Sequence, residues 1–102
     1  MILANITFAV SAEVDDHFID WAKNSFIKEA VEKGEFTSPL LCRIKSHDTD
    51  CATSYAIQLR HRSDSEAHDW YERGNGADLL TLLMQKFSDK ILWFITFMDI
   101  ID

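Results

Sequence analysis

The sequence contains few of the residues that mark disordered, secreted or metal-binding chains. Only three glycines, one proline and two cysteines occur among 102 residues. This scarcity, with 47% hydrophobic residues, predicts one compact domain spanning residues 1–102. The cysteines, Cys42 and Cys51, are too few for a disulfide scaffold and form no CxxC zinc spacing. We therefore expect reduced thiols, a cytoplasmic location, and neither a metal nor a cofactor.

Basic residues are also scarce, with 10 lysines and arginines against 17 aspartates and glutamates and a net charge of −7. An acidic surface repels nucleic-acid phosphates and anionic lipids, so we expect neither a nucleic-acid nor a membrane partner. Residues 1–12 are apolar, but the first basic residue is Lys23, which disfavours a signal peptide. Residues 90–102 are too few to cross a bilayer, which needs about 20 apolar residues.

Hydrophobic periodicity in the first third of the chain predicts a strand and a helix. Residues 2–10 alternate between apolar and mixed positions, as in a strand with one buried face. Residues 14–31 repeat apolar side chains every four residues, which is typical of an amphipathic helix. Ser11 can cap this helix, and Gly34 is a natural end for it.

The rest of the chain completes an alternating pattern. Its elements are strands over 36–47 and 53–62, a helix from a capping box at 63–66 to residue 87 that is interrupted at 74–76, and a strand over 90–102. Right-handed crossovers then give a ferredoxin-like α+β fold, βαββαβ. We expect a four-stranded antiparallel sheet with two helices on one face.

The second and third strands predict a hairpin around residues 48–51, with one apolar and one charged face. The predicted core pairs are Leu40 with Leu59, Cys42 with Ile57, and Ile44 with Tyr55. The predicted outer face carries Leu41, Arg43, Lys45, Ala56, Gln58 and Arg60.

The last strand is apolar on both of its faces. One set of alternating residues is Leu92, Phe94, Thr96, Met98 and Ile100, and the other includes Trp93, Ile95 and Phe97. An antiparallel sheet with one solvated face normally carries polar residues there. We expect one set to face the helices, and Trp93, Ile95 and Phe97 to face a second copy of the chain in a homodimer.

Short motifs are spread along nearly the whole length. They are Trp21, Gly34-Glu35-Phe36, Ser54-Tyr55-Ala56-Ile57-Gln58, Phe87, Phe94 and Thr96. In these positions the chain resembles an uncharacterised bacterial family, a domain of unknown function, and the resemblance implies a ferredoxin-like, dimeric α/β-barrel-type fold. The chain departs from the relatives at Phe26-Ile27-Lys28, where they carry His-Ile-Pro, and at Ile95, where they favour arginine. No role of that histidine or arginine is therefore carried over.

The mixed face of the predicted sheet is the first candidate site. Its members are Asn5, Thr7, Arg43, Gln58 and Arg60, with Trp93 beside them. Polar groups over an aromatic floor suit a small anionic or aromatic ligand, and they equally suit a half-polar dimer interface. A second candidate is a hydrophobic cleft between helices and sheet near Trp21, Tyr55 and Tyr71.

Titratable residues gather at two further places. His47, Asp48, Asp50 and Cys51 lie in the predicted hairpin turn, where such residues are common and the spacing matches no metal motif. Asp64, His68 and Glu72 share one face of the third helical stretch, as surface pairs often do. We therefore predict no catalytic and no metal-binding residues.

These patterns favour a non-enzymatic homodimer that acts as an interaction module for a small ligand or another protein. The alternative is a cofactor-free monooxygenase or a haem-degrading enzyme, because small dimeric ferredoxin-like proteins include both. That alternative depends on fold analogy.

Overall fold

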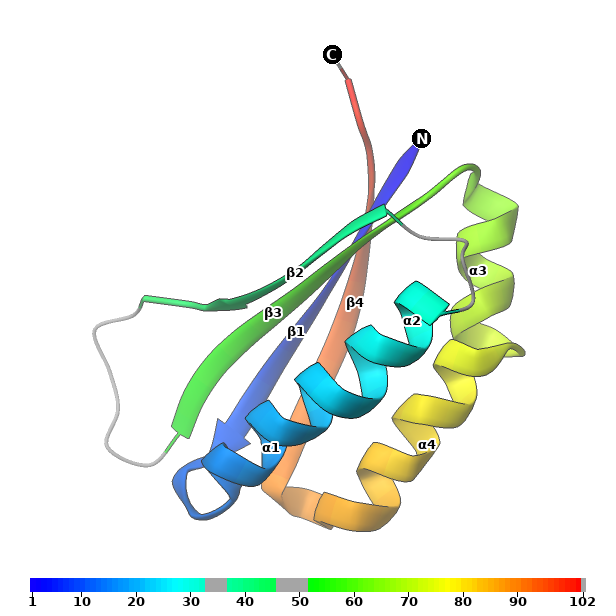
Figure 1. Ribbon diagram of the computed structural model, residues 1–102. Coiled ribbons are helices and arrows are strands. Elements are labelled where there is room, and N and C mark those ends of the chain that lie inside the picture. Colours follow the sequence, from blue (N-terminus) through cyan, green and yellow to red (C-terminus); the bar gives the residue numbers. More distant parts are fainter. Residues whose placement is uncertain (33–36, 46–51, 102) are drawn as a thin grey trace.

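The chain folds into an antiparallel sheet with helices on one side, seen in a computed structural model that describes residues 1–32, 37–45 and 52–101 (Figure 1). The strands are β1 (Ile2–Ser11), β2 (Thr37–Arg43), β3 (Ala52–His61) and β4 (Ile91–Asp99). Their order across the sheet is β2-β3-β1-β4, and the three neighbouring pairs are antiparallel. This confirms the predicted ferredoxin-like α+β fold.

The helical layer consists of two segments that cover the same face of the sheet (Figure 1). The first contains η1 (Ala12–Val14), α1 (Asp15–Trp21), the π-helix η2 (Ala22–Ile27) and α2 (Lys28–Glu32). The second contains α3 (Asp64–Glu72), α4 (Asn75–Phe87) and η3 (Ser88–Lys90). A π-helical stretch inside the first segment is a departure from the uninterrupted α-helix that the periodicity predicts. No helix in the described parts of the chain is long and apolar enough to cross a membrane.

The two helix starts differ in how they are capped. At α3 the Ser63 hydroxyl accepts a hydrogen bond from the Glu66 backbone N–H at 3.2 Å, which confirms that half of the predicted capping box. Ser11 makes no such bond, because a 3₁₀ turn separates it from α1. The interruption between α3 and α4 is also confirmed: Gly74 is the N-cap of α4, and a Cβ atom at Gly76 would collide with the ring of Trp70.

The core lies between the sheet and the helical layer and is rich in aromatic rings. Phe8, in the central strand β1, is buried with its ring centroid 4.9 Å from that of Phe18 and 6.3 Å from that of Trp21. Trp21 in turn lies 5.4 Å from Phe26, centroid to centroid. These rings join β1 to the first helical segment, so the predicted apolar stripe of that segment faces the sheet.

The β2–β3 hairpin departs from its predicted register by one residue. The observed pairs are Leu40 with Gln58, Leu41 with Ile57, Cys42 with Ala56, and Arg43 with Tyr55. Leu41 therefore packs against the core, while Leu40 and Cys42 are exposed on the other face. The pairing shifts between Thr37 and Leu40, where Ser38 has a φ of 52°. Because β2 is an edge strand, few core contacts select its register, and an irregularity of this kind can move it.

The predicted orientation of β4 is reversed. Trp93, Ile95 and Phe97 point toward the helices and pack against the core, whereas Leu92, Phe94 and Met98 are exposed on the opposite face. The reason is the pairing with β1, which sets Phe8 opposite Trp93, Ile6 opposite Ile95, and Ala4 opposite Phe97. Directly opposite residues lie on the same face of a sheet, so the buried set of β1 decides which set of β4 is buried.

Candidate functional site

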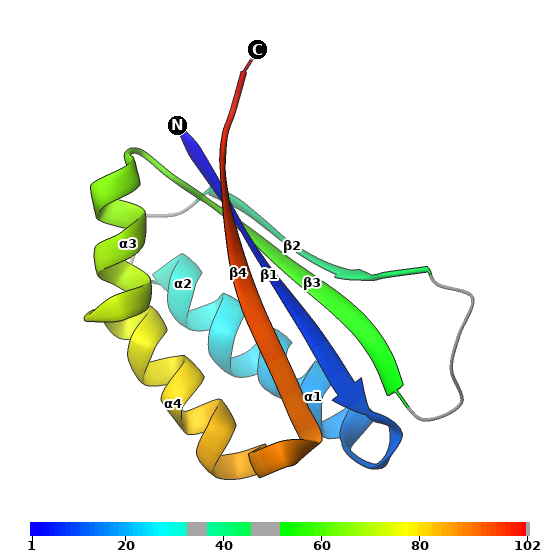
Figure 2. The same ribbon diagram turned by 180° about the vertical axis from the view of Figure 1, so that it is seen from behind.

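The face of the sheet that none of the described helices covers is the first candidate site, and Figure 2 shows it toward the viewer. We call it the open face. Its members, by strand alternation and pairing, are Leu3, Asn5, Thr7 and Ala9 of β1, Leu40 and Cys42 of β2, Ser54, Ala56, Gln58 and Arg60 of β3, and Leu92, Phe94, Thr96 and Met98 of β4.

Hydrogen-bonded amides occupy the centre of the open face. The Gln58 Nε2 donates to Asn5 Oδ1 at 3.0 Å, and the Asn5 Nδ2 donates to Thr7 Oγ1 at 3.1 Å. All three side chains are half-buried, and Asn5 and Gln58 are direct cross-strand partners. We call this group the amide ladder. Because amides both donate and accept, the ladder can form further hydrogen bonds with an uncharged polar partner.

Apolar side chains lie beside the amide ladder, mainly on the edge strand β4. Leu92 is 68% exposed, Phe94 60% and Met98 40%, and we call these three the β4 stripe. On the opposite edge strand, Leu40 is 54% exposed. The open face therefore combines a polar centre with apolar margins, which is the composition of many protein interfaces.

The structure separates the predicted ligand-binding residues into two groups. Asn5, Gln58 and Arg60 belong to the open face, as predicted. Arg43 and Trp93 lie on the helix-facing side, because Arg43 pairs with Tyr55 and Trp93 pairs with Phe8. The aromatic floor expected from Trp93 is therefore supplied on the open face by a different residue of the same strand, Phe94.

Arg43 instead takes part in a polar cluster at the end of the sheet near α1. Its guanidinium lies 5.7 Å from the centroid of the Tyr55 ring, and the Tyr55 hydroxyl donates to Asp15 Oδ1 at 2.6 Å. Burial, and next the hydrogen bond to Asp15, raise the pKa of Tyr55. Tyr55 thus stays protonated and links β3 to α1 as a hydrogen-bond donor, which is a structural role rather than that of a base.

A buried polar pair that the sequence analysis missed lies at the other end of β3. His61 is 1% exposed, and its Nε2 lies 3.0 Å from the Tyr71 hydroxyl. Burial lowers the pKa of His61 to about 4 and raises that of Tyr71, so both are neutral near pH 7. The alternation of β3 could have indicated that His61 is buried, because His61 continues the series of Ile57 and Leu59 on the buried face.

The second predicted site, a cleft between helices and sheet near Trp21, Tyr55 and Tyr71, is not a single cavity shared by the three rings. All three side chains are buried in the core cluster. Trp21 borders a surface pocket beside α4, while Tyr71 borders a different hollow beside β4. The three rings therefore do not line one common cavity.

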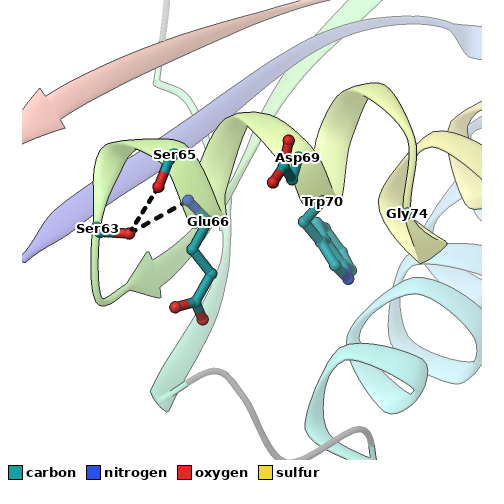
Figure 3. A pocket seen from close by; sticks show the side chains of 6 residues that line it. All are labelled: Ser63, Ser65, Glu66, Asp69, Trp70 and Gly74. Atoms are coloured by element: carbon teal, nitrogen blue, oxygen red, sulfur yellow. Dashed lines mark hydrogen bonds between the residues drawn. The ribbon is translucent and has the colours of Figure 1, made fainter.

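A hollow of about 460 Å³ lies beside α3 (Figure 3). It is lined by Ser63, Ser65, Glu66, Asp69, Trp70 and Gly74. Its polar groups already serve the helix: Ser63 caps it, and Asp69 accepts a hydrogen bond from Arg73 at 2.9 Å. Trp70 packs against Phe26 and Gly76. The residues that line this hollow are therefore accounted for by the capping and packing of the α3–α4 junction.

The titratable residues of α3 form a surface row. The two ring nitrogens of His68 lie 3.5 Å from carboxylate oxygens of Asp64 and Glu72, and its ring centroid lies 4.2 Å from that of Phe97. His68 is therefore held at the helix surface beside β4. Among the described residues, no group of three or more histidine, cysteine or acidic side chains gathers as a metal site would. The predicted turn residues His47, Asp48, Asp50 and Cys51 lie outside the described residues.

The family model of the domain of unknown function DUF4286 matches residues 1–101. The chain belongs to the DUF4286 family. This agrees with the resemblance to a domain of unknown function and assigns no chemistry. No curated protein matches the chain.

Solved structures share the fold of this DUF4286 chain at low sequence identity. A putative antibiotic biosynthesis monooxygenase from Deinococcus radiodurans is 15% identical with a TM-score of 0.68, and the match covers 100% of this chain and 94% of that one. HapK from Hahella chejuensis is 12% identical with a TM-score of 0.69, covering 99% and 93%. A dimeric ferredoxin-like protein from an uncultured marine organism is 9% identical with a TM-score of 0.54, covering 99% and 96%. Likeness at such identity supports the fold alone.

Proposed function

We propose that this DUF4286 chain acts as a homodimeric interaction module in which two open faces pack against each other. The observation that carries the proposal is the exposure of the β4 stripe, Leu92, Phe94 and Met98, on the face opposite the described helices. These three side chains leave about 300 Å² of apolar surface in water, as much as the largest patch on many monomers. At ~25 cal/mol/Å², covering it contributes up to roughly 8 kcal/mol per protomer before the costs of association.

The dimensions of the open face suit a stable dimer. Four strands about 4.8 Å apart and about nine residues long form a surface of roughly 19 by 30 Å. A standard interface buries about 800 Å² of accessible surface on each partner. A face of this extent, with its side chains, supplies that area without help from the helical layer.

The amide ladder gives the dimer a means of alignment. In a two-fold dimer each surface patch meets its own copy, so residues near the axis face their symmetry mates. Asn5 and Gln58 near that axis would exchange hydrogen bonds with the partner's amides, because each amide carries both donors and acceptors. A slipped or rotated pairing leaves these groups buried and unpaired at a cost of about 1–3 kcal/mol each.

Two solved structures of the same fold are themselves described as dimeric ferredoxin-like proteins, with TM-scores of 0.54 and 0.53. The exposed, free thiol of Cys42 on the open face is compatible with the reducing conditions of a cytoplasmic location. Both points support the proposal, whose main argument is the exposed apolar surface.

Sedimentation equilibrium of the purified chain, with light scattering across a dilution series, tests the proposal. We expect a mass of twice 11.8 kDa that falls toward one protomer on dilution. Phe94→Asp places a charge in the proposed interface and should give a monomer with unchanged circular dichroism. Leu82→Asp is the matched control, because Leu82 is 56% exposed on α4 in the helical layer. A wild-type protein that stays monomeric at every concentration contradicts the dimer.

An oxygenase activity is a second candidate, favoured by one observation. A hollow of about 200 Å³ opens where α3 and α4 meet β4, bordered by Tyr71, Ala77, Leu80, Thr81, Met84 and Trp93. Ordinary ligand sites have volumes of about 300–1,000 Å³, so this hollow admits at most a small single-ring substrate. Three of the similar structures have descriptions that name antibiotic biosynthesis monooxygenases.

Oxygen-electrode assays with single-ring quinol substrates test the oxygenase, and a haem titration tests the haem-degrading alternative. The oxygenase predicts oxygen uptake that depends on substrate and is lost when Trp93→Ala removes one wall of the hollow. A haem-degrading enzyme predicts a shifted Soret band. Neither signal is expected from an interaction module, and the absence of both rejects the enzyme candidates without affecting the dimer.

A further inference from the structure

A pocket of about 420 Å³ lies between the first helical segment and α4, on the side of the helices away from the open face. We call it the interhelical pocket. Its lining residues are Trp21, Ser25, Leu79, Leu82, Gln85 and Lys86. Trp21 and Leu79 are buried, whereas the other four are exposed. The pocket thus has an apolar floor that ends in the core, and a solvent-exposed rim that contains Leu82 and the polar residues Ser25, Gln85 and Lys86.

The backbone on one side of this pocket is unusual. The π-helix η2, Ala22–Ile27, starts directly after Trp21 and contains Ser25. Such π-helical turns are rare and often occur at functional sites. Here the wider turn still keeps Trp21 and Phe26, five residues apart, in contact within the core at 5.4 Å between ring centroids. The π-helix therefore forms part of the wall of this pocket through Ser25.

The chemistry of the lining specifies a ligand class. The apolar side chains of Trp21, Leu79 and Leu82 suit an apolar group of the ligand. At the rim, Ser25 and Gln85 provide neutral hydrogen-bonding groups, and Lys86 provides a positive charge. The Lys86 ammonium is 5.5 Å from the centroid of the Phe87 ring, a cation–π contact that favours its position beside α4. Lys86 is the one charged side chain among these lining residues, so an anionic group at the rim would meet a positive charge.

We propose that the interhelical pocket binds a small aromatic carboxylate, with its ring over Trp21 and Leu79 and its carboxylate at Lys86. The volume falls in the range of about 300–1,000 Å³ that is usual for ligand sites and admits one or two fused rings. The site is built from a single protomer, and its floor and rim do not include any residue of the open face. The proposal therefore goes beyond the homodimer and does not depend on it.

A titration with 2-naphthoate, followed by ¹H–¹⁵N correlation NMR on the full chain, tests the assignment. We expect saturable shifts of the Trp21 indole N–H and of the amides of Ser25, Leu79 and Lys86. The indole N–H signals of Trp70 and Trp93 serve as internal references. Saturable shifts centred on the β4 stripe, with Trp21 unaffected, would overturn the proposal, and so would the lack of saturation up to millimolar concentration.

Two variants separate the roles of charge and shape. Lys86→Gln should weaken 2-naphthoate about three- to tenfold and leave the weak binding of the neutral 2-naphthalenemethanol unchanged. Lys45→Gln, which removes an exposed lysine from a region far along the chain, is the matched control and should bind like wild type. Leu82→Trp should fill the pocket and reduce binding of both compounds at least tenfold.

The variants also give the outcomes that contradict the assignment. If Lys86→Gln and Lys45→Gln weaken the binding of 2-naphthoate equally, net charge alone attracts the ligand. The proposed contact with Lys86 is then wrong. Unchanged affinity in Leu82→Trp overturns the location. Neither result bears on the homodimer, because the sedimentation experiment tests association through the open face.

Discussion

The helix-facing side of the sheet and its open face alternate along the same strands, residue by residue. In β1, Ile6 and Phe8 are fully buried under the helices, while Asn5 and Thr7 between them are half-buried and hydrogen-bonded on the open face. In β4, Phe97 packs on Tyr71, while its neighbour Met98 is exposed on the open face. The first side holds the protomer together, and the second remains available for a partner.

In the edge strand β4, the two sets of alternate residues have two different roles. Alternate residues of β4 complete the core of the protomer through Trp93, Ile95 and Phe97. The intervening apolar residues Leu92, Phe94 and Met98 are exposed on the opposite face. Substitutions on the two sides should therefore change different measured quantities.

Phe8→Ala should have the largest effect on the free energy of unfolding. It removes a fully buried ring that contacts Phe18 and Trp21, and we expect a loss of about 3–5 kcal/mol in urea denaturation. The loss should be the same at every protein concentration. Phe94→Ala, on the open face, should lower stability only at concentrations where the dimer forms. If both variants lose a similar free energy of unfolding at every protein concentration, the two faces of the sheet do not differ in role.

Acidification should destabilise the helix-facing side through His61. Its folded pKa of about 4 lies below the unfolded value near 6.5, so the unfolded state binds more protons between these values. The stability due to neutral His61 is complete above pH 6.5 and is lost as the pH falls toward 4. We expect a contribution of about 2–3 kcal/mol to the loss between pH 7 and pH 4.5.

The measurement compares urea denaturation of wild type and His61→Gln at both pH values. Glutamine can still form a hydrogen bond with Tyr71, but it does not titrate, so the variant should lose less stability on acidification. Equal losses in the two proteins would show that His61 is already charged or accessible in the folded state.

Gly76→Ala should have the smallest of these three effects on unfolding. A Cβ atom at this position would lie 2.6 Å from Cζ3 of Trp70, so the ring or the start of α4 must move. We expect a loss of about 1–3 kcal/mol in thermal or urea denaturation. Gly74→Ala is the control, since its Cβ would lie 3.2 Å from the nearest atom of Trp70 and should cost less. If Gly76→Ala is as stable to denaturation as wild type, the α3–α4 junction packs loosely.

Much of the fold was predictable because local patterns carry it. The alternation in β1, the four-residue spacing of Phe18, Ala22 and Phe26, and the Ser63 cap each appear in the structure as expected. The π-helix was not predictable, since it preserves the same buried residues as an α-helix with one looser turn. The His61–Tyr71 pair was missed because its partners come from separate elements.

The candidate site was only partly predictable. Asn5, Gln58 and Arg60 share the open face as expected, because they follow the alternation of β1 and β3. Arg43 and Trp93 do not, because each depends on the register of an edge strand. A one-residue shift in β2 moves every side chain of that strand to the other face. For β4 both faces are apolar, so hydrophobicity does not distinguish the buried set from the exposed one.

The amino-acid order by itself determined the βαββαβ succession, the buried faces of the central strands and the helical stripe, because these depend on contacts within a few residues of each other. The tertiary structure decided which half of β4 is exposed, how β2 pairs, and that Trp21, Leu79 and Lys86 line one pocket. These features depend on pairings between segments far apart in the chain. An apolar pattern in the sequence predicts that a residue is buried, but only the folded chain shows which other segment packs against it.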